Sequence, residues 1–265
     1  MNDRARENAA EAVVLRSDEG GIATLTLNRP RQFNALSSAV LERMHAEIDA
    51  IAADEAVRVV VITGSGSAFC SGHDLKEMRG LAQAEVEHLF ATCGDMMQKL
   101  IALPQPVIAA VNGLATAAGC QLVAQCDLAI SADNARFAVS GINLGLFCST
   151  PAVALSRNVS RKRAAEMLFT GEFIDARTAA DWGLVNQVAP ADRLREATVE
   201  LANNLKAKPR TSLALGKALF YRQLQADLRA AYADAAHVIA GNMAGEEAQE
   251  GVDAFFAKRP PNWKK

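Results

Sequence analysis

The sequence is poor in the residues that mark several large classes of protein. Its 265 residues include only five cysteines and four histidines. The cysteines are scattered, odd in number and never spaced as Cys-x-x-Cys, which argues against a disulfide scaffold and fits a reducing compartment. The histidines do not cluster, so a zinc site is not expected and we predict no bound metal.

The chain also lacks a strong excess of one charge and any long apolar run. Its formal net charge is -2, which gives no electrostatic reason to expect nucleic acid or an anionic membrane as a partner. No apolar run reaches the roughly 18 residues that span a bilayer. Residues 1–11 mix Asp, Glu and Arg without an apolar stretch, unlike a secretory signal or a transit peptide. We therefore expect a cytoplasmic protein.

Half of the residues are hydrophobic, which is enough for a core of ordinary size. Strand and helix patterns alternate through the first part of the chain, and helix patterns alone follow, which predicts an α/β fold with a helical tail. Strands are expected at 13–15, 22–27, 57–63, 107–111, 127–131, 136–139 and 184–188. The late helices are expected at 192–204, 210–221, 226–240 and 244–257.

Two glycine-rich turns are the most informative feature of the chain. They span 63–77 and 111–122, and each follows an apolar β-branched run and leads into a segment with helix potential. Such a turn leaves backbone N–H groups unpaired at the edge of a cleft. One N–H group from each turn can hold a carbonyl oxygen that becomes negative during a reaction. Taken alone, the turns also fit a tight turn and a flexible loop.

Six ordered segments run through nearly the whole chain. They are Asn28-Arg-Pro with Asn34-Ala-Leu36, Ala68-Phe-Cys-Ser-Gly-His-Asp-Leu-Lys-Glu77, Pro106-Val-Ile-Ala-Ala-Val-Asn-Gly113, Ala118-Gly-Cys-Gln with Cys126-Asp127, Leu168-Phe-Thr-Gly171 with Ala180-Asp-Trp-Gly-Leu-Val185, and Ala254-Phe-Phe-Ala-Lys-Arg259. In this order they resemble the enoyl-CoA hydratase/isomerase (crotonase) superfamily. The wording of residues 71–77, 118–124 and 145–151 is typical of one subgroup of that superfamily.

The resemblance implies a crotonase-like α/β spiral of ββα units, followed by a C-terminal helical trimerisation region. Residues 1–195 would form the spiral core with the acyl-CoA site, and residues 196–265 the oligomerisation region. It further implies a homotrimer or a dimer of trimers. The partner would be a small acyl-CoA molecule, with coenzyme A as part of the thioester substrate and no permanently bound cofactor.

The resemblance also implies roles for individual residues of this sequence. The two oxyanion-hole N–H groups fall on His73 and Ala118. The adenine-side loop falls on Ser71 to Lys76, which includes Asp74 and Leu75. Arg29 would approach the phosphates of coenzyme A, and Phe255 and Lys258 would cover the nucleotide end of a neighbouring subunit's ligand. The other expected substrate-binding positions are Ala35, Leu114, Ala117 and Ser140.

The sequence departs from the hydratases of that superfamily at both proton-transferring positions. The two usual glutamates correspond to Gln121 and Gly141, and neither residue can exchange a proton near pH 7. An enoyl-CoA hydratase, a lyase of fatty acid metabolism, is thus the nominal function, while hydration itself is doubtful. Decarboxylation, thioester hydrolysis, acyl-CoA binding without catalysis and an oligomeric scaffold remain open. So do the roles of Cys148, Ser149 and the His73 side chain.

Overall fold

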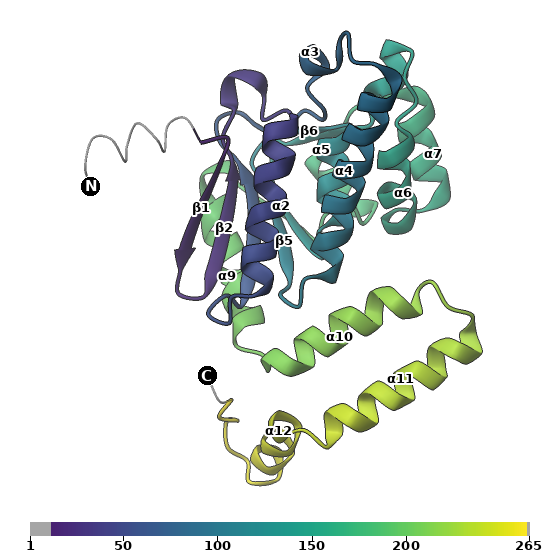
Figure 1. Cartoon of the computed structure of the whole chain (residues 1–265). Coiled ribbons are helices and arrows are strands. Elements are labelled where there is room, and N and C mark those ends of the chain that lie inside the picture. The colour runs from purple at the N-terminus through teal and green to yellow at the C-terminus, as the bar shows by residue number, and fades with distance from the viewer. Residues whose placement is uncertain (1–11, 264–265) are drawn as a thin grey trace.

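The computed structural model describes residues 12–263, in which ten strands form two sheets (Figure 1). The larger sheet has the strand order β1-β2-β3-β5-β7-β10, and the smaller has the order β4-β6-β8-β9. The larger sheet consists of β1 (Val14–Glu19), β2 (Ile22–Leu27), β3 (Val59–Gly64), β5 (Val107–Val111), β7 (Leu128–Ala132) and β10 (Gln187–Ala189). The smaller consists of β4 (Ala68–Cys70), β6 (Leu114–Thr116), β8 (Arg136–Ala138) and β9 (Ile174–Asp175).

The larger sheet is parallel apart from the antiparallel hairpin of β1 and β2. Its central strands β3 and β5 are buried almost throughout, because helices cover both faces. Helices α2 (Ser38–Ala52) and α4 (Gln83–Ala102) lie on one face and α9 (Leu194–Lys206) on the other (Figure 1). On the α9 face, Ala202 packs in one apolar cluster with β3 and β5 side chains. The predicted boundary at residue 195 therefore falls inside a helix of the core.

Each predicted glycine-rich turn contains a short strand that joins the second sheet. Strand β4 lies in the first turn and β6 in the second, and the two pair in parallel. The chain therefore repeats a strand of the large sheet, a strand of the small sheet and a helix. This repeat agrees with the ββα spiral that the resemblance implies. The sequence pattern marked these segments only as turns, because strands of three residues are too short to show a period.

The remaining elements complete the layers around these sheets. They are η1 (Pro30–Gln32), α3 (Leu75–Met78), α5 (Ala118–Gln125), η2 (Ser140–Leu144), α6 (Ser149–Asn158), α7 (Arg161–Thr170), α8 (Ala176–Asp181) and η3 (Ala191–Arg193). The strand expected at 184–188 is displaced to 187–189. The reason is that the Leu184 N–H donates to Ala179 O, so this residue closes α8 instead of joining the sheet.

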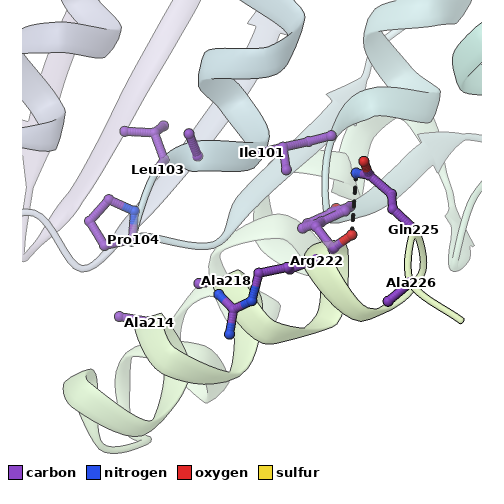
Figure 2. Close-up of a pocket in the computed structure, with 10 residues that line it drawn as sticks. Ile101, Leu103, Pro104, Ala214, Ala218, Arg222, Gln225 and Ala226 are labelled. Atoms are coloured by element: carbon purple, nitrogen blue, oxygen red, sulfur yellow. Dashed lines mark hydrogen bonds between the residues drawn. The ribbon is translucent and has the colours of Figure 1, made fainter. Parts of the chain in front are cut away.

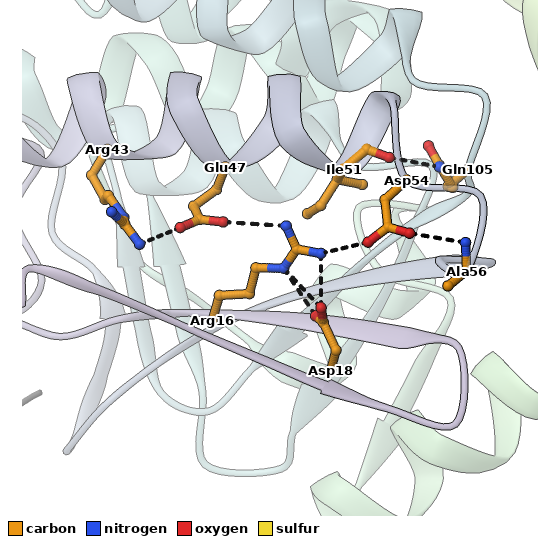
Figure 3. A network of polar contacts seen from close by, with 8 residues as sticks. All are labelled: Arg16, Asp18, Arg43, Glu47, Ile51, Asp54, Ala56 and Gln105. Carbon is orange, nitrogen blue, oxygen red and sulfur yellow. Dashed lines mark hydrogen bonds and ion pairs between the residues drawn. The ribbon is translucent and has the colours of Figure 1, made fainter. Parts of the chain in front are cut away.

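A charged network joins the β1–β2 hairpin to α2 (Figure 3). The Arg16 guanidinium binds Asp18 at 2.8 Å, Asp54 at 3.1 Å and Glu47 at 3.5 Å. Glu47 also pairs with Arg43 one helical turn earlier. Because the Arg16 side chain is only 18% exposed, these ion pairs are screened less than surface pairs. The network fixes the outer hairpin against the core.

The last three helices, α10 (Arg210–Gln223), α11 (Leu228–Met243) and α12 (Glu246–Phe256), extend away from the sheets (Figure 1). Helix α10 is attached through Lys217, whose Nζ donates to Leu100 O, Gln105 O and Asp127 Oδ2. Large apolar side chains on these helices stay exposed, such as Leu228 and Tyr232. Their role in trimerisation stays a prediction.

Candidate active site

A cavity of about 810 Å³ opens where the two glycine-rich turns meet. Its volume is in the range of small-molecule sites in proteins. Residues 31–35 and 71–78 contribute one wall of its lining, and residues 140–151 contribute a second wall. The first residues of α5 and one side of α4 complete the lining.

The first turn presents the backbone N–H of His73. The residues on both sides of it are fixed, because Leu36 N donates to Gly72 O at 2.8 Å and Asp74 N donates to Leu36 O at 3.0 Å. The Asp74 carboxylate then caps α3 by accepting from the N–H groups of Lys76 and Glu77. Among residues 12–263, no acceptor binds the His73 N–H itself.

The second turn presents the backbone N–H of Ala118 in a similar way. Ala118 is the first residue of α5, so its N–H has no partner within the helix. The residue before it, Ala117, has φ +48° and ψ -119°, a conformation that L-residues rarely adopt. The Ala117 N–H donates to Ala138 O at 2.9 Å and fixes this strained turn. No acceptor for the Ala118 N–H is found in the described part of the chain.

A hydrogen bond and the absence of a side chain at Gly72 allow the two turns to lie close together. Thr116 Oγ1 donates to Ser71 O at 3.0 Å. A Cβ atom added to Gly72 would lie 2.9 Å from the Ala117 Cβ and 3.3 Å from the Ala118 nitrogen. Only glycine permits this approach. The two free N–H groups therefore belong to adjacent turns that line one cavity, an arrangement able to polarise a carbonyl oxygen placed between them.

Most of the site residues expected from the sequence line this cavity. Six come from the first turn and its neighbour: Ala35, Ser71, His73, Asp74, Leu75 and Lys76. Four come from the second turn and the second wall: Ala117, Ala118, Ser140 and Gly141.

The other five expected residues do not line it. The Arg29 guanidinium binds Asp74 Oδ2 and Ala35 O, both at 2.9 Å, so it braces the first turn. Leu114 lies in β6 and Gln121 in the buried part of α5. Phe255 is the second-last residue of α12 and Lys258 follows that helix, in the region that extends from the core (Figure 1).

Sequence reasoning missed two groups of lining residues. Val86 and Phe90 of α4 line the cavity, and their helical spacing indicates a helix without showing which side faces a ligand. Leu144, Leu146 and Phe147 belong to the second wall. Their signal was present in the sequence as large apolar residues in a segment with no regular period.

The two positions of the missing glutamates differ in their surroundings. Gln121 is 5% exposed, and its buried Oε1 accepts no hydrogen bond from the described residues. Gly141 is enclosed, since an added Cβ would lie 2.7 Å from both Cys148 Sγ and Leu146 O. Asp74 is the carboxylate that lines the cavity, and Arg29 and two N–H groups already bind it. The cavity thus has a polarising pair without a free carboxylate.

Two titratable side chains that line the cavity, His73 and Cys148, are held neutral. The His73 ring packs edge-on against Phe90 with centroids 4.6 Å apart, and its buried Nε2 has no partner among residues 12–263. Desolvation lowers the pKa of His73 to about 4, although the Glu77 charge opposes this shift. Burial raises the pKa of the Cys148 thiol, although a hydrogen bond from Gly141 N opposes it. Neither group carries a charge near pH 7.

A second cavity of about 620 Å³ lies between the end of α4 and α10 (Figure 2). Ile101, Leu103, Ala214 and Ala218 make its lining largely apolar, and its cation, Arg222, is paired with Asp234 at 2.7 Å. It has no counterpart of the N–H pair. Within residues 12–263, no three His, Cys, Asp or Glu side chains gather as metal ligands. None of the helices in that range is long and apolar enough to cross a membrane.

Comparison with known proteins identifies the class to which this fold and site belong. A family model described as Enoyl-CoA hydratase/isomerase matches residues 17–265, and the chain belongs to that family. A crystal structure of enoyl-CoA hydratase from Mycobacterium smegmatis has a TM-score of 0.94 and 55% identity, covering 96% of this chain and 99% of that one. The predicted crotonase-type α/β fold is thereby confirmed.

Particular relatives confirm the subgroup. Enoyl-CoA hydratase domain-containing protein 3, mitochondrial, from Mus musculus is 47% identical over 247 residues, which are 92% of this chain and 82% of that protein. The crystal structure of the human protein of that name has a TM-score of 0.91 and 44% identity, covering 95% of this chain and 100% of that one. The segments Ser-Gly-His-Asp-Leu-Lys-Glu, Ala-Gly-Cys-Gln-Leu-Val-Ala and Gly-Leu-Phe-Cys-Ser-Thr-Pro had indicated this subgroup.

The names of these relatives contradict the expected cytoplasmic location. The curated proteins from mouse, rat, Xenopus laevis and human all carry the word mitochondrial in their names. The cytoplasmic prediction is therefore wrong. It rested on the composition of residues 1–11, which lie outside the described residues and say nothing about the folded region shared with these relatives.

Proposed function

We propose that this protein binds an acyl-CoA thioester in the 810 Å³ cavity, with the thioester oxygen accepting hydrogen bonds from the N–H groups of His73 and Ala118. The observation that carries this proposal is the pair of unengaged N–H groups on adjacent turns. Gly72 and the Thr116–Ser71 hydrogen bond hold these turns together. Two preorganised donors stabilise negative charge on such an oxygen without reorganisation during the reaction.

Coenzyme A would enter as part of the substrate, with no cofactor bound permanently. The exposed cations Arg31 and Lys76 lie on the cavity wall and suit its phosphates. Arg29 supports this end indirectly, by holding Asp74 in the first turn. Phe255 and Lys258 would contribute from a neighbouring copy in a homotrimer or a dimer of trimers.

The nominal reaction is hydration of an enoyl thioester, a lyase reaction of fatty acid metabolism, and we expect it to be slow. Positioned acid–base groups contribute about 10²–10⁴-fold in rate. Gln121 and Gly141 supply none, and Asp74 is occupied by Arg29 and two backbone groups. A polarised carbonyl alone leaves two alternatives open. One is a reaction that places negative charge on the thioester oxygen and needs less side-chain help, such as decarboxylation through an enolate or thioester hydrolysis through a tetrahedral intermediate. The other is binding without catalysis.

Two measurements test the proposal on the full chain. Titration calorimetry with butyryl-CoA and with free coenzyme A should show heat for both and tighter binding of the thioester. Steady-state assays should use crotonyl-, malonyl- and 3-hydroxyacyl-CoA. Hydration of crotonyl-CoA should be weak, and decarboxylation of malonyl-CoA would identify an enolate reaction. No heat at millimolar ligand would overturn acyl-CoA binding. Hydration near 10²–10³ per second would refute the role given to Gln121 and Gly141.

A further inference from the structure

The two walls of the cavity differ in charge. The wall of residues 31–35 and 71–78 carries Arg31, Asp74 and Lys76. The second wall, of residues 140–151, belongs to a stretch, 137–156, that contains no charged residue. The cavity thus has one wall suited to a polyanion and one wall with nothing to pair a charge.

The uncharged wall is also apolar and open. Leu144, Leu146 and Phe147 line the cavity and are 64%, 52% and 48% exposed. Covering such surface with an apolar group is favourable, because apolar area is removed from water. Val86 and Phe90 of α4 add further apolar lining to the same cavity. An apolar group placed along these side chains is stabilised, whereas a charged group there has no partner.

The cavity that contains these side chains also contains the two free N–H groups. Ser140 and Gly141 begin the uncharged wall, and they line the cavity together with His73 and Ala118. A thioester whose oxygen lies at the N–H pair and whose phosphates lie near Arg31 and Lys76 leaves the uncharged wall for its acyl chain. Because the uncharged wall and the N–H pair belong to the same cavity, the acyl chain is favoured over a second protein as the group that covers this wall.

We propose that the wall of residues 140–151 determines acyl specificity, accepting an uncharged apolar chain and rejecting a chain that ends in a carboxylate. This inference rests on the acyl-CoA binding proposed above. Burying a carboxylate against apolar side chains without a partner is strongly unfavourable. Added methylene groups, in contrast, gain affinity as they cover Leu144, Leu146 and Phe147.

Hexanoyl-CoA and adipyl-CoA provide the test, because both acyl groups have six carbons and only adipyl ends in a carboxylate. Titration calorimetry on the full chain should show at least tenfold tighter binding of hexanoyl-CoA. Leu146→Lys places a cation on the wall, and it should reduce that ratio at least fivefold by improving adipyl-CoA binding. The matched control is Val153→Lys on α6. Val153 is 54% exposed and outside the cavity lining, so this variant should leave the ratio unchanged.

The outcomes separate this inference from the function on which it rests. If both thioesters bind with equal affinity, the specificity inference is overturned and acyl-CoA binding stands. If neither binds, the proposed function fails as well. If Leu146→Lys changes the oligomeric state in size-exclusion chromatography and leaves the ratio unaltered, the wall is a subunit contact and the inference is wrong.

Discussion

The Sγ atom of Cys148 lies 3.3 Å from the backbone nitrogen of Gly141 and accepts its hydrogen bond. The thiol thereby occupies the space that a side chain at residue 141 would need. Leu146 O closes the same space, because both atoms lie 2.7 Å from the position of an added Cβ. A glutamate at residue 141 is therefore incompatible with this loop, and the lack of one is built into its packing.

Gly141→Ala should lower the free energy of unfolding by about 1–3 kcal/mol, because the added methyl group overlaps both neighbours. Combining it with Cys148→Ala should recover only part of this loss, since Leu146 O remains in place. Denaturant unfolding of the two single variants and the double variant measures the coupling. Additive losses would show that the thiol does not restrict residue 141.

Gly72→Ala should weaken the polarisation of a bound thioester. Its Cβ would lie 2.9 Å from the Ala117 Cβ and separate the two turns. Gly80→Ala is a matched control, because Gly80 has φ +95° against +96° for Gly72 and no atom within 4 Å of an added Cβ. The C=O stretching frequency of bound butyryl-CoA, measured by isotope-edited infrared spectroscopy, should fall less in Gly72→Ala than in Gly80→Ala. Equal frequencies would argue against the N–H pair.

The stability of the protein should depend on pH through His73. Its pKa falls from 6.5 to about 4 on folding, so between these values the unfolded chain binds a proton that the folded chain does not. Stability is therefore lost as pH falls from 6.5 toward 4, by about 3 kcal/mol over the window. The loss of unfolding free energy between pH 7 and pH 4.5 should be about 3 kcal/mol larger in the wild type than in His73→Gln. The same difference in both proteins would contradict the buried neutral imidazole.

Lys217→Met should detach α10 from the core or strongly destabilise it. The Lys217 ammonium is 6% exposed and lies 2.7 Å from Asp127 Oδ2, so its removal leaves a carboxylate without its cation. Breaking a buried pair in this way costs about 3–5 kcal/mol. Thermal unfolding and limited proteolysis near residue 209 should both report the change. Arg222→Met, which removes an exposed pair with Asp234 on neighbouring helices, should have a much smaller effect.

Much of the fold could be predicted, because its long elements carry a clear period. The apolar face of α2, from Val40 to Ile51, has helical spacing, and the buried runs of β3 and β5 read as strands. Strands β4 and β6 could not be found in this way. They are three residues long and are defined by pairing with each other across some 45 residues of sequence.

The candidate site was predicted in part for a similar reason. The glycine turns predicted that each turn presents a backbone N–H group, and the family resemblance assigned these groups to His73 and Ala118. The small residues in the turns permit the close approach of Gly72 to Ala117. The role of Arg29 could not be read in the same way. Its partner Asp74 lies 45 residues away, and only folding reveals that this cation is already bound.

The sequence by itself determined that neither of the positions expected to move protons carries a carboxylate, because Gln121 and Gly141 are identities that no folding can change. It also determined the order of the longer strands and helices, through periods that are local along the chain. Only the tertiary structure decided that two distant N–H groups line one cavity, that Cys148 closes the space beside Gly141, and that a charged wall and an uncharged wall belong to the same cavity. These are relationships across a cavity, and they depend on contacts that no local pattern encodes.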